Sequence, residues 1–149
     1  MAYRYPYNDD EVKEYKPARL NDKRSTLLFY TLTLLTLGIY ALFFFMPFSF
    51  DLDKVAPKRD GSKTINFLFV FILSYLTGSL AMCVWEYHIA DRVEEALIQR
   101  GINYKFGTND FWTYQVLGSF IIVGPFIFMY KLIHAMNLLC ADYNKEHGI

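Results

Sequence analysis

The longest apolar stretch of the chain runs from Ser25 to Phe50 and holds 26 consecutive residues without a charged side chain. About 20 helical residues cross the hydrocarbon core of a bilayer, and a small soluble core cannot hide an apolar cylinder of this length. The stretch therefore predicts an integral membrane protein. We expect its first span over residues 25–47, because Pro47 removes a backbone amide and clashes with the preceding turn of the helix.

Two further uncharged runs predict two more spans, over residues 64–85 and 111–130. Each run continues without a helix breaker into an amphipathic stretch, over residues 86–100 and 131–146. The predicted fold is an all-α membrane protein with three transmembrane helices and amphipathic helical extensions after spans two and three.

The extensions carry apolar residues at helical spacing on one face. The predicted stripes are Trp85, Ile89, Val93, Ala96 and Leu97, and then Leu132, Met136, Leu139, Cys140 and Tyr143. Glu86 and Asp91 are assigned to the opposite face, which we expect to be solvated. Cys140 and Cys83 lack the C-x-x-C spacing of a zinc or redox motif, so both are interpreted as small apolar residues. Acylation of Cys140 near a membrane surface is the alternative.

The length of 149 residues leaves room for a single membrane domain, residues 25–149, after a polar tail, residues 1–24. Proline interrupts this tail, which is therefore expected to be flexible. Candidate contacts to a partner or to lipid headgroups are aromatic: Tyr3, Tyr5, Tyr7, Trp85 and Trp112. Fifteen basic residues balance fifteen acidic ones, which gives no electrostatic reason to expect nucleic-acid binding.

Glycines in the middle of the three runs indicate a weak internal three-fold repeat. Thirteen residues after Gly38, Gly78 and Gly124 come the candidate polar repeat positions, which are Asp51, Asp91 and Asn137. A second register is also open. Anchoring the repeat on Trp85 aligns Ser79, instead of Gly78, with Gly38.

These motifs resemble a small bacterial membrane family, domain of unknown function 4234, over residues 23–146. The resemblance is carried by TLGIY at Thr36 to Tyr40, WEY at Trp85 to Tyr87, ADRV at Ala90 to Val93, and a third glycine-bearing run that ends in Asn137 and Tyr143. The chain departs from the family pattern at Phe44, where tryptophan is usual, and at Thr77 to Leu80, which read TGSL. The resemblance implies a multi-span bacterial membrane protein and no established activity.

Small residues predict where the spans pack, because close backbone approach stabilises helix pairs in lipid. The predicted seam between spans one and two consists of Gly38, Ala41, Ser74, Gly78 and Ala81. A ligand notch or a hinge at these positions is the alternative interpretation.

Three crossings place the two ends of the chain on opposite sides of the membrane. Nine basic residues then lie on the side of the N-terminal tail and six on the other side, which favours an N-terminus inside a bacterial cytoplasmic membrane. His88, with Asp91 and Glu94 or Glu95, has helical metal-ligand spacing, but a solvated helix face explains the same pattern. His134 would lie on the other membrane face. We therefore expect no metal and no cofactor.

The three predicted spans contain no ionisable residue and no catalytic motif, which argues against a proton-coupled carrier and against an enzyme. The function that these patterns favour is a structural or accessory role in the bilayer, through packing with a second copy or a larger partner. Two alternatives remain: an oligomeric channel or permease lined by residues such as Thr36 and Ser74, and a membrane immunity protein against a secreted toxin.

Overall fold

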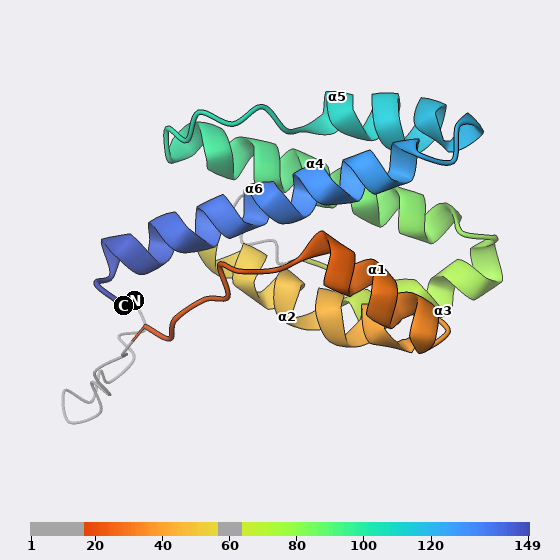
Figure 1. Cartoon of the computed structure of the whole chain (residues 1–149), viewed down its shortest axis with the longest axis horizontal. Coiled ribbons are helices and arrows are strands. Elements are labelled where there is room, and N and C mark those ends of the chain that lie inside the picture. The colour runs from red at the N-terminus through yellow and green to blue at the C-terminus, as the bar shows by residue number, and fades with distance from the viewer. Residues whose placement is uncertain (1–16, 57–63) are drawn as a thin grey trace, which may run out of the picture.

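A computed structural model describes residues 17–56 and 64–149, and the regular elements in these ranges are all helices (Figure 1). They pair into three hairpins. Hairpin 1 is formed by α1 (Thr26–Leu35) and α2 (Ile39–Val55), and hairpin 2 by α3 (Phe67–Thr77) and α4 (Leu80–Gln99). Hairpin 3 is formed by α5 (Thr108–Asp110), the π-helix η2 (Phe111–Val116), the 3₁₀-helix η3 (Leu117–Phe120) and α6 (Gly124–Glu146).

None of the three predicted spans is one continuous helix. The run 25–47 turns back at Leu37 and Gly38, whose φ angles are 51° and 94°, and the run 64–85 turns back at Gly78 and Ser79, with φ angles of 60° and 73°. A left-handed residue ends a helix because its carbonyl leaves the helical ladder. The run 111–130 is interrupted between η3 and α6. The prediction of three continuous crossings is therefore not confirmed.

The predicted extensions are correct as helices, because α4 and α6 continue unbroken to Gln99 and Glu146. Among the described residues, α6 is the one helix long and apolar enough to cross a membrane by length and composition, and 50% of its apolar window is buried inside the protein. That burial is also what a core helix would show.

The first two turns are built in the same way. The N–H of Gly38 bonds the carbonyl of Thr33 (2.8 Å), and the N–H of Ser79 bonds that of Ser74 (2.9 Å). The hydroxyl of Thr36 also accepts from the N–H of Tyr40 (2.9 Å). Thr77 does the same for Ala81 (3.2 Å). The side chain before each turn thus begins the second helix by satisfying one of its free amides.

The core lies between the second helices of the hairpins, α2, α4 and α6, and the three helices bury equivalent positions. Phe45 and Glu86 are 41 residues apart, and Glu86 and Met129 are 43 apart. With these offsets, the following sets are all buried: Phe44, Trp85 and Phe128; Phe48, Ile89 and Leu132; Leu52, Val93 and Met136; Val55, Ala96 and Leu139; Ala56, Leu97 and Cys140. The apolar stripes predicted on α4 and α6 are therefore confirmed. The register is the one anchored on Trp85, and it aligns Ser79 with Gly38.

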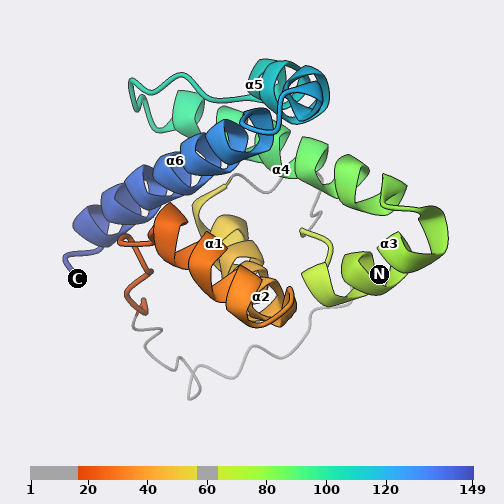
Figure 2. The same ribbon diagram turned by 45° about the vertical axis from the view of Figure 1, so that its right-hand side comes forward.

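All three turns lie at one end of the molecule, and the C-terminal ends of α2, α4 and α6 lie at the other (Figure 1). Figure 2 separates the hairpins, with α1 and α2 at the bottom, α3 and α4 at the right, and α5 beside α6 at the top. Because every hairpin points the same way, the chain has an end made of turns and an end made of helix termini and links.

Candidate functional site

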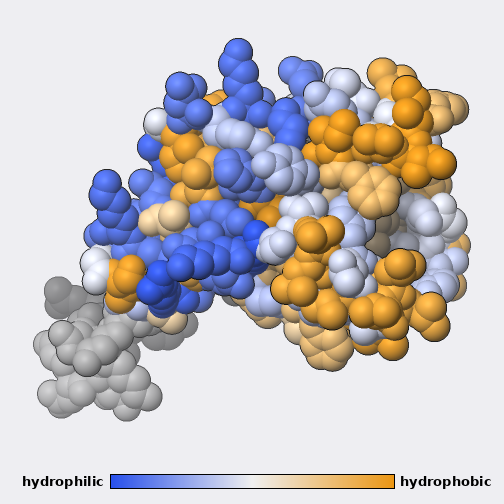
Figure 3. Space-filling model, viewed as in Figure 1, coloured by the Kyte–Doolittle hydropathy of each residue, from blue (hydrophilic) through white to orange (hydrophobic). Residues whose placement is uncertain are grey.

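The turn end is covered by exposed apolar side chains, which we call the apolar tips. Figure 3 shows this end as hydrophobic and the opposite end as hydrophilic. Tip residues more than 60% exposed include Leu34, Leu35, Leu37, Leu76, Leu80, Phe120, Ile121 and Ile122. Monomeric soluble proteins rarely expose large apolar patches, so the tips are a candidate surface for contact with lipid or with another protein.

An aromatic belt borders the tips on hairpins 2 and 3. It consists of Tyr87, Trp112 and Tyr130, which are 36%, 55% and 57% exposed. The rings of Tyr87 and Trp112 are 6.3 Å apart. Charged groups lie next to the belt, where Lys131 pairs with Asp110. Exposed tyrosine and tryptophan between apolar and charged surfaces are typical of the boundary between hydrocarbon and water.

Below the belt, a polar ring joins each hairpin to the next. A side chain on the second helix accepts a bond from a backbone N–H at the start of the following hairpin. The bonds are Thr64 to Asp53 (2.7 Å), Thr108 to Glu94 (2.9 Å) and Arg24 to Asn137 (3.0 Å). The third bond returns to hairpin 1, so the ring is closed. Its members on α2, α4 and α6 obey the same 41- and 43-residue offsets as the core.

The register of the ring corrects the predicted polar repeat positions. The equivalent residues are Asp53, Glu94 and Asn137, whereas the prediction was Asp51, Asp91 and Asn137. Anchoring on the glycines caused the error, because Gly38 aligns with Ser79 and the third turn contains no equivalent glycine.

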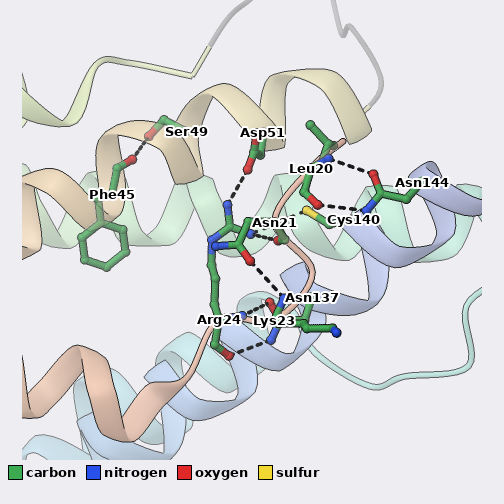
Figure 4. A network of polar contacts seen from close by, with 10 residues as sticks. All are labelled: Leu20, Asn21, Lys23, Arg24, Phe45, Ser49, Asp51, Asn137, Cys140 and Asn144. Atoms are coloured by element: carbon green, nitrogen blue, oxygen red, sulfur yellow. Dashed lines mark hydrogen bonds and ion pairs between the residues drawn. The ribbon is translucent and has the colours of Figure 1, made fainter. Parts of the chain in front are cut away.

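Arg24 is a buried cation in the ring, with 4% of its side chain exposed (Figure 4). Its guanidinium pairs with Asp51 and lies 5.5 Å from the centre of the Phe48 ring. Asn137 bonds the backbone of Arg24 on both sides, since its amide also donates to the Arg24 carbonyl (2.8 Å). Two predicted positions, Asp51 and Asn137, therefore meet at Arg24. Asp91 lies on α4, partly exposed.

A second asparagine on α6 holds the same segment. Asn144 accepts from the N–H of Leu20 (2.8 Å) and donates to its carbonyl (2.9 Å), and it is only 3% exposed. Figure 4 shows Asn137 and Asn144 on α6 facing the extended segment that leads into α1. Two side-chain amides thus replace the backbone partners that an extended chain would find in a sheet.

Glu86 is a buried carboxyl that the sequence reasoning assigned to a solvated face. It is 8% exposed and accepts a bond from the amide of Gln115 on η2 (2.7 Å). It lies at the level of the belt, one residue before Tyr87. Burial raises the pKa of Glu86 to about 7, and the bond from Gln115 opposes this shift. In the register anchored on Trp85, Glu86 is equivalent to Phe45 and Met129, which are apolar and buried. This equivalence was the signal in the sequence for the burial of Glu86.

The glycines of the predicted seam occupy turns. A Cβ atom added at Gly38 or Gly78 would meet nothing within 4 Å, so these residues supply left-handed backbone and no close packing. Close backbone approach occurs in hairpin 3 instead. A Cβ on Gly118 would lie 2.7 Å from the Cα of Gly124. In the sequence, the signal for this close approach was the presence of a glycine on each side of the third turn, at Gly118 and Gly124.

The remaining seam residues are partly buried within their own hairpins: Ala41, Ser74 and Ala81. The Ser74 hydroxyl donates to the carbonyl of Val70 (2.7 Å), and that of Thr36 donates to the carbonyl of Leu32 (2.7 Å). Both hydroxyls suggested for a pore are therefore bonded to their own helix.

The predicted aromatic contacts divide into three cases. Trp85 is 3% exposed and donates to the carbonyl of Ile65 (3.1 Å), so it belongs to the core and is not on the surface. Trp112 is exposed in the belt. Tyr3, Tyr5 and Tyr7 lie outside the described residues. Within the described ranges, no three His, Cys, Asp or Glu side chains are grouped as metal ligands.

Comparison with known families identifies part of the chain. Residues 24–95 match the model of a domain of unknown function, DUF4234. This confirms the resemblance over hairpin 1 and most of hairpin 2, slightly less than half of the chain. No curated protein matches the chain significantly. The same holds for solved structures. The TLGIY motif that carries the resemblance is the turn of hairpin 1.

Proposed function

We propose that this chain is a membrane protein whose three hairpins enter one leaflet of the bilayer by their apolar tips, with a structural or accessory interaction role there. The single observation that carries the proposal is the gathering of all three exposed tips at one end of the molecule, opposite the charged end (Figure 3). The charged end, with its ring and links, is the part available to a second copy or a larger partner.

The depth of the tips supports entry into one leaflet. From the turn at Ser79 to Tyr87 in the belt, α4 rises about 12 Å at about 1.5 Å per residue. From the third turn to Tyr130 the rise is similar. The hydrocarbon core of a bilayer is about 30 Å thick, so the tips of hairpins 2 and 3 reach less than halfway across.

The first two turns are suited to lipid because a threonine hydroxyl bonds backbone groups on both sides of each turn. In hydrocarbon an unpaired N–H or carbonyl costs several kcal/mol. Thr36 and Thr77 each bond one carbonyl before the turn and one N–H after it. The threonine hydroxyls in these apolar segments therefore have a role in the turns, and a pore is not needed to explain them.

The composition of α6 is compatible with a hairpin arm. Beyond Tyr130 its exposed residues are His134, Ala141, Lys145 and Glu146, of which Ala141 alone is apolar. Its apolar residues beyond the belt, such as Leu132 and Met136, are buried in the core. Its mean hydropathy therefore reflects packing against α2 and α4.

Hairpins that return to their starting side put both termini and both links on one face. All nine basic residues of the described ranges then lie on that face. The positive-inside rule makes it the cytoplasmic face, and the family resemblance makes the bacterial cytoplasmic membrane the expected location.

Single-cysteine labelling in sealed vesicles tests the topology. In a background with Cys83→Ser and Cys140→Ser, Asn103→Cys marks the second link and Lys145→Cys marks the C-terminal end. We expect a membrane-impermeant maleimide to label both from the same side. Three crossings would instead place them on opposite sides. Ile122→Cys at the third tip serves as the control and should stay unlabelled from either side until detergent is added.

A further inference from the structure

A cleft of about 570 Å³ lies between the two helices of hairpin 2. Its walls are apolar along most of its length, with Val70 and Leu73 on α3 facing Ala81 and Val84 on α4. Its two ends differ. Thr77 and Leu80 lie at the tip, whereas Thr64, His88 and Arg92 lie at the charged end.

The equivalent surface of hairpin 1 is filled by aromatic rings. Its cleft measures about 210 Å³ and is lined by Tyr40, Phe43 and Phe44. These rings precede Ala81, Val84 and Trp85 by 41 residues each. The rings of Tyr40 and Phe44 are 6.3 Å apart. Hairpin 2 is therefore open because alanine and valine replace tyrosine and phenylalanine.

Hairpin 3 closes the same surface by backbone contact. Gly124 is the counterpart of Ala81, and it packs directly on Gly118 of the opposite arm. No side chain separates the two arms at this level. Of the three related hairpins, hairpin 2 has the wide cleft, so the opening is a local feature and not a consequence of the fold.

The length and polarity of the cleft match one chain of a lipid. From Leu80 to Arg92, α4 rises about 18 Å. Half of the hydrocarbon core, which is the depth of one leaflet, is about 15 Å. A ligand that is apolar over this length and polar at one end, with the polar end at the membrane surface, has the chemistry of a phospholipid.

The charged end of the cleft offers donors to a phosphate. The guanidinium of Arg92 is held there by Asp53 (2.7 Å) and by the hydroxyl of Thr64. His88 is exposed one helical turn nearer the tip. Arginine binds phosphate oxygens through several N–H groups at once. Both bonds of Arg92 to Asp53 and Thr64 use Nη1, so its other N–H groups can donate to a phosphate.

We propose that the cleft between α3 and α4 binds a phospholipid, with one acyl chain along Ala81 and Val84 and the phosphate at His88 and Arg92. This inference rests on the proposed function, because the bilayer supplies the ligand. It adds a specific lipid site to a surface that would otherwise contact bulk lipid.

Quenching of Trp85 tests the acyl-chain site. The full chain with Trp112→Phe keeps Trp85, in the cleft wall, as its one tryptophan. In detergent, phosphatidylglycerol with bromine atoms on its acyl chain should quench Trp85 saturably. Ala81→Tyr, which introduces the hairpin 1 residue, should weaken this binding by about tenfold or more.

Two further variants make the result decisive. Val84→Phe changes an exposed position to its hairpin 1 counterpart and should weaken binding even if Ala81→Tyr fails to fold. Ile127→Phe, at the equivalent position of hairpin 3, should bind like the parent. Quenching that does not saturate, or that Val84→Phe leaves unchanged, would overturn the site.

The phosphate contact has its own test. Brominated diacylglycerol with the same chains should bind about tenfold more weakly than the phospholipid, and His88→Gln should reduce that difference. Equal affinity for both lipids would refute the phosphate site. The labelling of Asn103→Cys and Lys145→Cys does not depend on the cleft, so failure of lipid binding with same-sided labelling would leave the proposed function standing.

Discussion

Single residues decide where each apolar run turns back. In hairpin 1, Leu37 takes a left-handed conformation that is costly for a residue with a Cβ atom, at about 1–2 kcal/mol. Thr36 compensates by bonding the backbone on both sides of the turn. Ser79 and Thr77 repeat this pair in hairpin 2. The recurring threonine is therefore a feature of the turn, and its hydroxyl is not available to a ligand.

Glu86 gives a prediction at the same scale. Its pKa is raised to about 7 in the fold, whereas an unfolded glutamate titrates near about 4.3. Between these values the folded protein binds more protons than the unfolded chain, so the free energy of unfolding falls as pH rises from about 4 to about 7 and then levels off. We expect Glu86→Gln to remove this slope and to be more stable than the parent at pH 8, by on the order of 3 kcal/mol.

Denaturation in mixed micelles at several pH values measures the effect. Glu146→Gln is the control for the loss of one carboxyl group, because the side chain of Glu146 is 62% exposed. An identical pH dependence in Glu86→Gln and the parent would show that the carboxyl is not desolvated.

At the scale of elements, hairpin 3 differs from the other two in its first arm. Where hairpins 1 and 2 have α-helices, it has the π-helix η2 followed by the 3₁₀-helix η3. This irregular arm brings Gly118 onto Gly124 and directs Gln115 to Glu86. The change of helix type thus accompanies both the closed surface of hairpin 3 and the partner of the buried carboxyl.

The two kinds of glycine predict different costs of substitution. Gly78→Ala should cost about 1 kcal/mol, because only backbone strain is added in open space. Gly124→Ala should cost about 3 kcal/mol, because its methyl group would overlap the backbone of Gly118 and force the arms apart. Unfolding curves of both variants in the same detergent provide the measurement. A larger loss for Gly78→Ala would mean that the first arm of hairpin 3 is not packed on α6.

At the scale of the whole molecule, the closed ring makes the three hairpins nearly equivalent. Each is bonded to the next by a side chain on its second helix, and Asn137 returns the series to Arg24. Asn144 also holds Leu20 near the C-terminal end of α6. The order in which the chain visits the hairpins should therefore matter little to their packing.

Circular permutation tests this equivalence. A chain that begins at residue 60, runs to residue 149 and continues from residue 1 to residue 59 should keep the helical content and come within about 2 kcal/mol of the parent stability. Far-UV circular dichroism and denaturation provide the readout. A permutant that begins at residue 93, inside α4, is the matched control and should not fold; equal behaviour of both would contradict the ring.

The sequence by itself determined the local features of this protein. Apolar periodicity is a property of neighbouring residues, so the buried stripes of α4 and α6, the continuous helices to Gln99 and Glu146, and the resemblance carried by Thr36 to Tyr40 could all be predicted. The glycines were also found, but their role was not, because a glycine in an apolar run is compatible with close packing and with a turn.

Only the tertiary structure decided whether an apolar run continues or turns back. The choice depends on a few kcal/mol of left-handed strain at Leu37 or Ser79 against the packing of a second arm on the first, and that packing involves residues far apart in the chain. The same is true of Glu86, whose burial follows from the approach of Gln115 on another hairpin. Long-range contacts thus convert three apparent spans into three hairpins, with their charged ends joined in one ring.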